Sequence, residues 1–342
     1  MTTPSPEVGL ADVAARAAVS VATASRALTG RGELKRETRE RVLAAAAELG
    51  YDRASRPAGR PTTQDTRLIE FVLGAFDDAW TDAMITGARR AAFELGYDLA
   101  LTLERDDPDD DWPTRVATRR PSGVVLGIIQ PTHRQLAELG GLRIPIVLLE
   151  PRSEPGGSLV SVGTTDWQGG FDAGRHLVQS GAERFVVLTG VPRYRFGRAR
   201  EEGFHAAVAA LRPDADIRHV DSLWSDATVT DALIHALRSG EGSVGVFACN
   251  DGMARAVYRG ARALELRIPE DISVIGFNDE PHASRMRPPL STVHQPLGDM
   301  ARKAVEIVHT MHRGSGAPHG RVELPCHLVL RESTLPIPAA QE

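Results

Sequence analysis

Apolar residues near the start of the chain repeat with the period of a helix. One set falls at i, i+3, i+4 and i+7, on one face of a short helix: Leu10, Val13, Ala14 and Ala17. Ser20 is a suitable N-cap for a second helix over Val21–Leu28, because its hydroxyl can accept from a free backbone N–H. A third helix is expected over Arg36–Leu49. Two short helices joined by a tight turn are typical of the DNA-binding helix-turn-helix.

Further along, apolar runs of strand length alternate with segments of helical period. The runs are Leu68–Leu73, Leu99–Leu103, Gly123–Ile129, Ile146–Leu149, Phe185–Leu188, Val244–Cys249 and Val274–Phe277. The helical segments are Met84–Gly96, Gly169–Ser180, Arg198–Leu211, Thr228–Ser239 and Met253–Leu264. This alternation predicts parallel sheets covered by helices, so the expected fold class is α/β behind a small all-α head.

The composition narrows the class of protein. The chain has 342 residues, 42% hydrophobic and 25% charged, as in an ordinary globular protein of two or three domains. It has no apolar run long enough to span a membrane and no apolar signal segment at its start, so we expect it in the cytoplasm. Cys249 and Cys326 predict no disulfide framework. The eleven histidines show no metal-ligand spacing, and His309 and His312 fit a solvated helix face, so no metal or cofactor is expected.

Charge is distributed unevenly along the chain. Residues 1–60 hold 10 Lys and Arg against 7 Asp and Glu, a net +3, whereas the remainder holds 30 against 38, a net −8. A basic head on an acidic body fits a protein that docks on DNA through its head, because phosphates attract the head and repel the body.

Two stretches carry a family resemblance. LADVAARAAVSVATASRAL with TRERVLAAAAELGY, and GVFACNDGMARAVYRGARALELRIPEDISVIGFND with PPLSTVHQP, resemble the LacI/GalR family of regulators. The resemblance implies a helix-turn-helix head at 1–51, a hinge or linker at 52–66, and a periplasmic-binding-protein-like core at 67–335. It also implies three chain crossings near 162, 289 and 322, giving a first lobe of 67–161 and 290–321 and a second of 162–289 and 322–335. An alanine-rich bundle without a DNA role is the alternative for the head.

The resemblance also implies which head residues meet DNA. In this family the second helix enters the major groove. Val21, Ala22 and Arg26 are expected at base edges. Arg26 can donate two hydrogen bonds to a guanine, whereas the other two offer only apolar contacts. Phosphate contacts are expected from Thr23, Ser25, Lys35, Thr38 and Arg39. A solvated arginine on the helix surface is the alternative for Arg26.

Two head positions depart from the family pattern. Ala18 stands where the family usually has a glycine, so a positive φ there would cost roughly 1 kcal/mol. Lys35 stands where a serine usually caps the third helix; it cannot cap, but it can still reach a phosphate.

The linker departs further. In the family it forms a short hinge helix with a leucine that wedges into the minor groove. Here Arg60 takes the place of the leucine, between Pro57 and Pro61, and proline inside a helix costs about 3 kcal/mol. We hypothesise that Arg56, Gly59 and Arg60 form an extended arm in the minor groove, since narrow A·T-rich grooves attract arginine. A plain flexible linker is the alternative.

An effector pocket is implied between the two lobes. A sugar-type ligand needs hydrogen-bonding groups and an aromatic face within an apolar frame. The matched positions are Glu150, Arg200, Trp224, Asn250 and Asn278, with Asp78 and Trp80 on the other wall and Asp166 contributing from nearby. The family more often has aspartate where Asn278 stands. Asp251 and Asp279 are interpreted as possible helix-start residues, and an ordinary surface or interface aromatic is the alternative for Trp80.

The sequence bears on three classes of function. A ligand-responsive repressor is favoured, as a homodimer reading two half-sites of double-stranded operator DNA about 34–36 Å apart. A solute-binding protein that delivers a sugar to a transporter is the second class, and the helix-turn-helix head argues against it. An enzyme is ranked last, because no phosphate-binding glycine loop, G-x-S-x-G or paired metal motif is present. The tail after Pro336 has no leucine heptad, so a dimer rather than a tetramer is expected.

Overall fold

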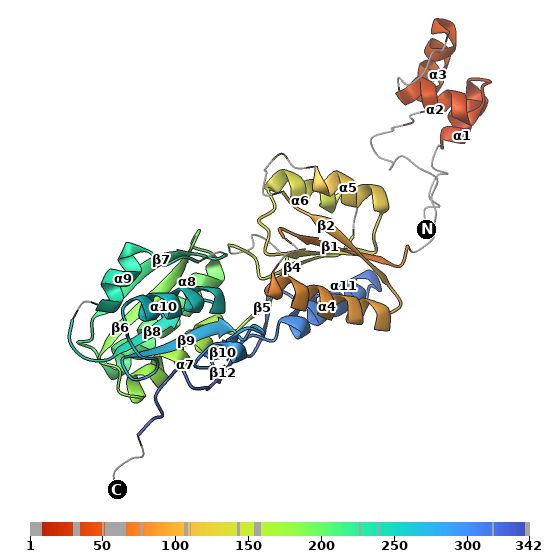
Figure 1. Ribbon diagram of the computed structural model, residues 1–342. Coiled ribbons are helices and arrows are strands. Elements are labelled where there is room, and N and C mark those ends of the chain that lie inside the picture. The colour runs from red at the N-terminus through yellow and green to blue at the C-terminus, as the bar shows by residue number, and fades with distance from the viewer. Residues whose placement is uncertain are drawn as a thin grey trace. The chain divides into compact units, whose positions relative to one another are not determined.

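The computed structural model describes most of the chain (Figure 1). The described residues are 9–29, 35–49, 51, 66–75, 78–105, 109, 111–141, 144–153, 159–225, 227–238, 240–316 and 318–338. The chain divides into two units, Met1–Gln64 and Asp65–Glu342. Within the described residues, no helix is long and apolar enough to cross a membrane.

The head consists of three helices, α1 (Leu10–Arg16), α2 (Val21–Thr29) and α3 (Arg36–Glu48). Their shared core is made almost entirely of alanine and valine: Val13, Ala14, Ala17, Ala24, Ala27, Val42, Ala45 and Ala46. Such small side chains let short helices approach closely. The Arg41 guanidinium donates to the carbonyl oxygen of Ala17 over 3.0 Å and ties α3 to the turn.

The turn between α1 and α2 confirms the predicted N-cap and shows the backbone conformation of Ala18. Ala18 adopts a φ of 52°, the left-handed conformation that a glycine would adopt without strain. Ser20 Oγ accepts from the backbone N–H of Thr23 over 3.1 Å, which is the N-cap bond expected for α2. Gly50, expected to end α3, lies outside the described residues.

The first lobe of the core is built on a parallel sheet of six strands in the order β11-β5-β4-β3-β1-β2. The strands are β1 (Leu68–Leu73), β2 (Asp98–Leu103), β3 (Gly123–Gly127), β4 (Ile146–Leu149), β5 (Val160–Thr164) and β11 (Arg321–Leu324). Helices α4 (Ala79–Glu94) and α11 (Leu297–His312) cover one face, and α5 (Trp112–Arg119) and α6 (His133–Gly140) cover the other (Figure 1). Both faces are buried, which explains the continuous apolar runs in the sequence.

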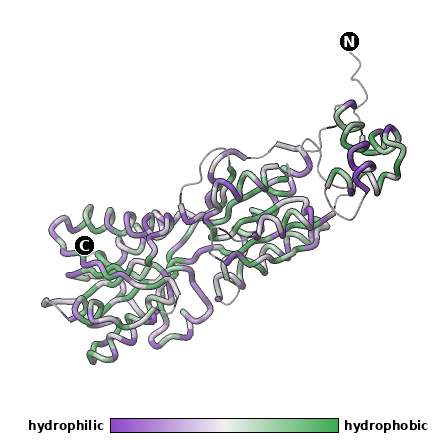
Figure 2. Tube along the Cα trace, turned by 90° about the horizontal axis from the view of Figure 1, so that it is seen from above, coloured by the Kyte–Doolittle hydropathy of each residue, from purple (hydrophilic) through white to green (hydrophobic). Residues whose placement is uncertain are grey.

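The second lobe repeats this architecture with the strand order β12-β10-β9-β8-β6-β7. Its strands are β6 (Arg184–Val191), β7 (Ile217–Leu223), β8 (Val244–Ala248), β9 (Ile272–Asn278), β10 (Ser291–His294) and β12 (His327–Val329), of which β12 is antiparallel. Its helices are α7 (Asp166–Gln179), α8 (Arg195–Leu211), α9 (Asp231–Arg238), α10 (Asp251–Ala263) and the short η1 (Ala283–Arg285). Figure 2 shows the hydrophobic segments running mainly through the interior of the unit Asp65–Glu342, which holds both lobes.

Helices α7 and α8 pack unusually closely because of two glycines. A Cβ at Gly170 would lie 2.0 Å from the carbonyl oxygen of Arg200, and one at Gly203 would lie 1.9 Å from that of Trp167. The glycines therefore let the two backbones touch. This contact fixes α8, and with it the position of Arg200.

The chain crosses between the lobes three times, and the crossings lie a few residues later than the expected 162, 289 and 322. They follow β5, β10 and β11. Strand β10 pairs with β9 in the second sheet, although 290–321 was expected in the first lobe. Strand β11 pairs with β5 in the first sheet, although 322–335 was expected in the second lobe. The period of a strand carries no information about which sheet it joins, so the boundaries could not come from the pattern.

Candidate functional site

On the head, the exposed side of α2 is opposite its alanine core. Ala24 and Ala27 are buried, whereas Arg26 is exposed and Val21 is 49% exposed. Thr23 and Ser25 are half-buried, and the Thr23 hydroxyl lies 2.8 Å from that of Ser20. Val21 in the first turn of α2 and Arg26 in the second are therefore accessible, while the side chain of Ala22 lies outside the described structure.

The start of α3 adds basic residues to the head. Lys35 is exposed, and Thr38 and Arg39 are half-buried one turn further on. The Nε of Arg39 is shielded from solvent and has no hydrogen-bond partner among the described residues. A shielded guanidinium N–H without a partner suits an anion such as a phosphate. Arg56 and Arg60 lie outside the described residues.

In the core, charged side chains meet where the chain crosses between the lobes. Glu150 follows β4 with a φ of 46°, Asp166 begins α7, and Arg200 projects from α8. Each of the three is at least 98% buried. Arg200 Nε donates to Asp166 Oδ1 over 2.9 Å. These three residues were expected in one pocket, and the structure brings them together.

Arg321, at the start of β11, completes this group. Its guanidinium donates to Glu150 Oε1 over 3.0 Å and lies 3.7 Å from Asp166 Oδ2. Its side chain crosses over Gly163, where a Cβ would lie 2.0 Å from Arg321 Nη2. The four charges of Glu150, Asp166, Arg200 and Arg321, hereafter the crossing network, therefore join both lobes.

A neutral amide binds the same network. Gln295, in the second crossing, donates to Thr164 Oγ1 over 2.9 Å and to Glu150 Oε2 over 3.5 Å. Within the described part of the chain, three buried atoms of this region have no hydrogen-bond partner: Asp166 Oδ2, Gln295 Oε1 and Arg321 Nη1. Buried polar atoms are normally satisfied, so these are available to a polar ligand.

Burial changes the protonation of the two acids. It raises the pKa of Glu150 to about 7, with the charge of Asp166 as a second cause and the arginines opposing it. Burial also raises the pKa of Asp166, against the opposing effect of Arg200. The crossing network is thus close to the point at which one proton is gained or lost near neutral pH.

Asn278 and Asn250 lie at the carboxyl edge of the second sheet. Asn278 Oδ1 is 3.5 Å from Arg200 Nη1, and its amide donates to Glu280 over 3.0 Å. Asn250 caps α10 by accepting from the N–H of Met253 over 2.7 Å, and its amide donates to the carbonyl oxygen of Trp224 over 2.9 Å. Asn278 therefore touches the crossing network directly, whereas Asn250 supports the tryptophan.

An aromatic wall stands beside the crossing network in the second lobe. The Trp224 ring lies against Gly190 and Gly197, where added Cβ atoms would approach it to 2.0 and 2.7 Å. Tyr194 stacks on it at 5.8 Å and Phe196 meets it edge-on at 4.9 Å. The indole N–H donates to the Pro192 carbonyl oxygen over 2.7 Å, which fixes the ring.

The first lobe reaches this wall through the segment after β4. The Arg152 guanidinium lies 5.4 Å from the centre of the Tyr194 ring, and the Arg152 carbonyl oxygen accepts from the N–H of Arg195 over 2.8 Å. The two lobes are thus in contact at the edge of the aromatic wall.

Four further acidic or aromatic residues that the sequence singled out have contacts of their own, outside the crossing network. Asp78 is exposed and caps α4 by accepting from the N–H of Thr81 over 2.6 Å, while Trp80 packs against the first lobe's core. Asp251 is a buried first residue of α10 and accepts from Thr292 over 2.6 Å, and burial raises its pKa to about 8. Asp279 pairs with Arg331 over 2.6 Å; it follows β9 and starts no helix.

Arg321 and Gln295 are two residues of this region that the sequence did not predict. Arg321 stands 171 residues from Glu150, and Gln295 stands 145 residues from it. Both residues lie next to chain crossings, and a position at a crossing was the one feature that could have pointed to them. The crossings had been expected a few residues away.

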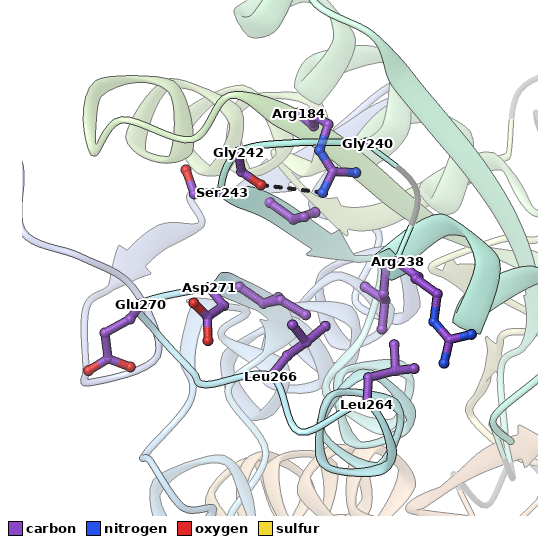
Figure 3. A pocket seen from close by; sticks show the side chains of 12 residues that line it. Arg184, Arg238, Gly240, Gly242, Ser243, Leu264, Leu266, Glu270 and Asp271 are labelled. Atoms are coloured by element: carbon purple, nitrogen blue, oxygen red, sulfur yellow. Dashed lines mark hydrogen bonds between the residues drawn. The ribbon is translucent and has the colours of Figure 1, made fainter.

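A surface pocket of about 380 Å³ lies elsewhere in the second lobe (Figure 3). It is lined by residues at the amino ends of β6, β8 and β9, and Arg184 donates to the Gly242 carbonyl oxygen across it over 3.3 Å. Ligands of open α/β sheets bind beyond the carboxyl ends of the strands. The crossing network, rather than this pocket, has the position of a ligand site.

Comparisons with known proteins agree with both halves of this description. Residues 9–54 match the family model of bacterial regulatory proteins, lacI family, and residues 175–334 match a periplasmic binding protein-like domain. The HTH-type transcriptional regulator reg1 of Streptomyces lividans is 30% identical, over 96% of this chain and 97% of its own length.

Two solved structures are similar over the same extent. One is a lac repressor dimer bound to operator and the anti-inducer ONPF, with 25% identity, a TM-score of 0.69, and coverage of 97% of this chain and 100% of that chain. The other is the complex of the transcriptional regulator CelR with cellobiose, also at 25% identity and a TM-score of 0.69, covering 96% of this chain and 100% of that one.

Proposed function

The chain belongs to the LacI family of DNA-binding transcription regulators, and on this premise we propose which of its residues bind the operator and which bind the effector. The family architecture joins a helix-turn-helix head to a sugar-binding type of effector domain. The observation that carries the proposal is the crossing network, because it places unsatisfied buried polar atoms beside an aromatic wall and joins the two lobes.

For the operator, α2 reads the bases. Val21, Ala22 and Arg26 contact base edges in the major groove, with Arg26 on a guanine. Phosphate contacts position the head and come from Thr23, Ser25, Lys35, Thr38 and Arg39. The shielded Nε of Arg39 supports its role. Arg56 and Arg60 enter the adjacent minor groove as an extended arm.

For the effector, the proposed ligand is a small polyhydroxylated molecule. Asp166 and Glu150 accept from its hydroxyls, and Arg200 and Asn278 bind it from the second lobe. Trp224 supplies the aromatic face, held in place by Asn250. Arg321 is added to the set because it contacts both acids. Asp78 and Trp80 remain a prediction for the first-lobe wall. Cellobiose and ribose bound to two similar regulators support the ligand class.

The operator site and the effector site are coupled through the closure of the two lobes. A ligand that binds both lobes changes their closure, and in a homodimer this alters the spacing of two heads over two half-sites. Binding of effector and of DNA is then reciprocal, so each changes the affinity of the other by the same factor.

The test is operator binding by fluorescence anisotropy, with the DNA upstream of the protein's own gene. It is measured with and without a panel of sugars, at two salt concentrations. We expect tight, salt-sensitive binding that one sugar changes, and that response should be lost in Arg200→Met while DNA binding without sugar is kept. Specific DNA binding that no sugar alters, in the wild type, would contradict the ligand class.

A further inference from the structure

A second group of ligand-type side chains lies on the second lobe, outside the crossing network. Glu201 and His205 stand one turn apart on α8, and His219 is on β7, the edge strand of the sheet. Each offers one ligand atom, and the three atoms lie within 4.8 Å of one another. Two imidazoles and a carboxylate converging from a helix and a strand are a ligand set that binds transition metals.

The side chains of this group are already held toward one point. His219 Nδ1 lies 2.9 Å from Glu201 Oε1, and the His205 and His219 rings are parallel, with centres 4.7 Å apart and planes at 6°. The Nε2 of His205 is shielded from solvent and has no hydrogen-bond partner among the described residues. Side-chain contacts within the group therefore leave one imidazole nitrogen unsatisfied.

Arg193 is a positively charged neighbour of the group, and its charge is offset by acids. The other oxygen of Glu201 accepts from Arg193 over 3.0 Å, and Arg193 also pairs with Asp221 over 2.9 Å. The charge of Arg193 is thus compensated by two acids.

The group opens onto a surface pocket, which gives a metal ion a route of entry. The pocket has a volume of about 390 Å³ and is lined by Arg193, Arg198, Glu201, Glu202 and His205. An exchangeable surface ion fits such an open position better than a fully enclosed one does.

We propose that Glu201, His205 and His219 form a binding site for a divalent transition metal ion, Zn²⁺, on the second lobe. Three protein ligands leave a fourth tetrahedral position for water. Zn²⁺ rather than Mg²⁺ is expected, because imidazole nitrogens suit the former and Mg²⁺ prefers oxygen ligands in an octahedral arrangement.

The metal site also has a regulatory role, and this role rests on the proposed function. Arg200 precedes Glu201 on α8, and β7 ends at Leu223, directly before Trp224. A bound ion would join the helix that carries Arg200 to the strand that leads into the aromatic wall. Zn²⁺ therefore changes effector affinity by holding these two elements together.

The first experiment measures metal binding alone, on the full chain freed of metal by a chelator. Zn²⁺ affinity and stoichiometry are determined at pH 7.5 by competition with a chromophoric chelator, with Mg²⁺ titrated in parallel. We expect one Zn²⁺ per chain, no competition by Mg²⁺, and a loss of affinity of about tenfold or more in His205→Asn and in His219→Asn. The exposed His133 at the start of α6 gives the matched control, His133→Asn, which should bind as the wild type does.

Folding is controlled by thermal melting of each variant in the presence of the chelator. His219 is exposed on an edge strand, so its replacement tests the site even where that of His205 disturbs packing. Stoichiometric Zn²⁺ binding that survives in both variants overturns the site.

The second experiment measures affinity for whichever sugar changes operator binding, with and without saturating Zn²⁺. A change of a few fold in the wild type that His219→Asn abolishes supports the coupling. An unchanged affinity overturns the coupling. Because the first experiment uses no sugar, the metal site is tested even where the proposed effector class fails.

Discussion

The head and the sensor core place their functional groups in opposite ways. The head packs on alanine and valine, and the residues proposed to read DNA lie on its accessible side. In the core, the groups proposed to bind ligand are buried charges that also join the lobes. Substitution in the head should therefore change DNA binding with little effect on folding, whereas substitution in the core should affect stability and ligand binding together.

The largest effect is expected from breaking the crossing network. Arg200→Ala leaves Asp166 buried without its closest partner, and the remaining positive charges of Arg321 and Arg195 lie further away. Removing one partner of a buried ion pair costs about 3–5 kcal/mol. The free energy of unfolding, measured with urea, should fall by that amount.

The matched control is an arginine on the neighbouring helix. Arg175 pairs with Asp172 on α7 over 3.0 Å, but its side chain is 52% exposed. Arg175→Ala should cost less than about 1 kcal/mol, as exposed ion pairs do. Equal losses of unfolding free energy in Arg200→Ala and Arg175→Ala would show that burial does not determine the strength of these ion pairs.

The next largest effect is a change of stability with pH, caused by the protonation of Glu150. Its pKa is raised to about 7 in the folded protein, from 4.5, so between these values the folded state holds a proton that the unfolded chain has lost. Stability therefore falls as pH rises through this window, by up to roughly 3 kcal/mol. Urea unfolding of the wild type from pH 5 to 8 should show this fall.

Glu150→Gln isolates the contribution of that one group. The amide does not titrate, so the variant should lose part of the pH dependence. The remainder includes the other buried acids whose pKa burial raises, Asp166 and Asp251, the latter to about 8. Identical pH profiles for variant and wild type would assign the whole dependence to other groups.

In the head, Arg26→Ala should act on DNA alone. Loss of a bidentate contact with guanine costs about 1–3 kcal/mol of discrimination, or roughly ten- to a hundredfold in operator affinity. Affinity for unrelated DNA and the urea midpoint of the core should stay the same. An equal loss on both DNAs in the anisotropy assay would make Arg26 a phosphate contact instead.

A structural feature could be predicted from the sequence where the residues that form it lie close together along the chain. The Ser20 cap followed from the local pattern, and the placing of Asp166 and Arg200 in one pocket region followed from family resemblance; the structure has the cap and brings the two side chains together. Arg321 was missed because its contact with Glu150 spans 171 residues and depends on a chain crossing. No residue spacing encodes such a contact.

The metal-ligand group was missed for a related reason. Glu201 and His205 stand at i and i+4 on one helix, which was a readable signal. Their third member, His219, comes from a neighbouring strand, and its parallel stacking on His205 arises only when β7 lies beside α8. The histidines could therefore not be grouped from the sequence.

The smallest effect concerns backbone strain in the head. Ala18 is held at a φ of 52°, which costs an alanine roughly 1 kcal/mol and costs a glycine little. Ala18→Gly also makes the unfolded chain more flexible, which offsets part of the gain. We therefore expect a net stabilisation of the head of somewhat less than about 1 kcal/mol, seen as slower hydrogen exchange of α2 amides in the full chain. Exchange in the core should be unchanged, since the substitution touches neither lobe. Faster exchange in α2 would mean that unfolded-state entropy outweighs the strain, and that the alanine costs the head less than its φ suggests.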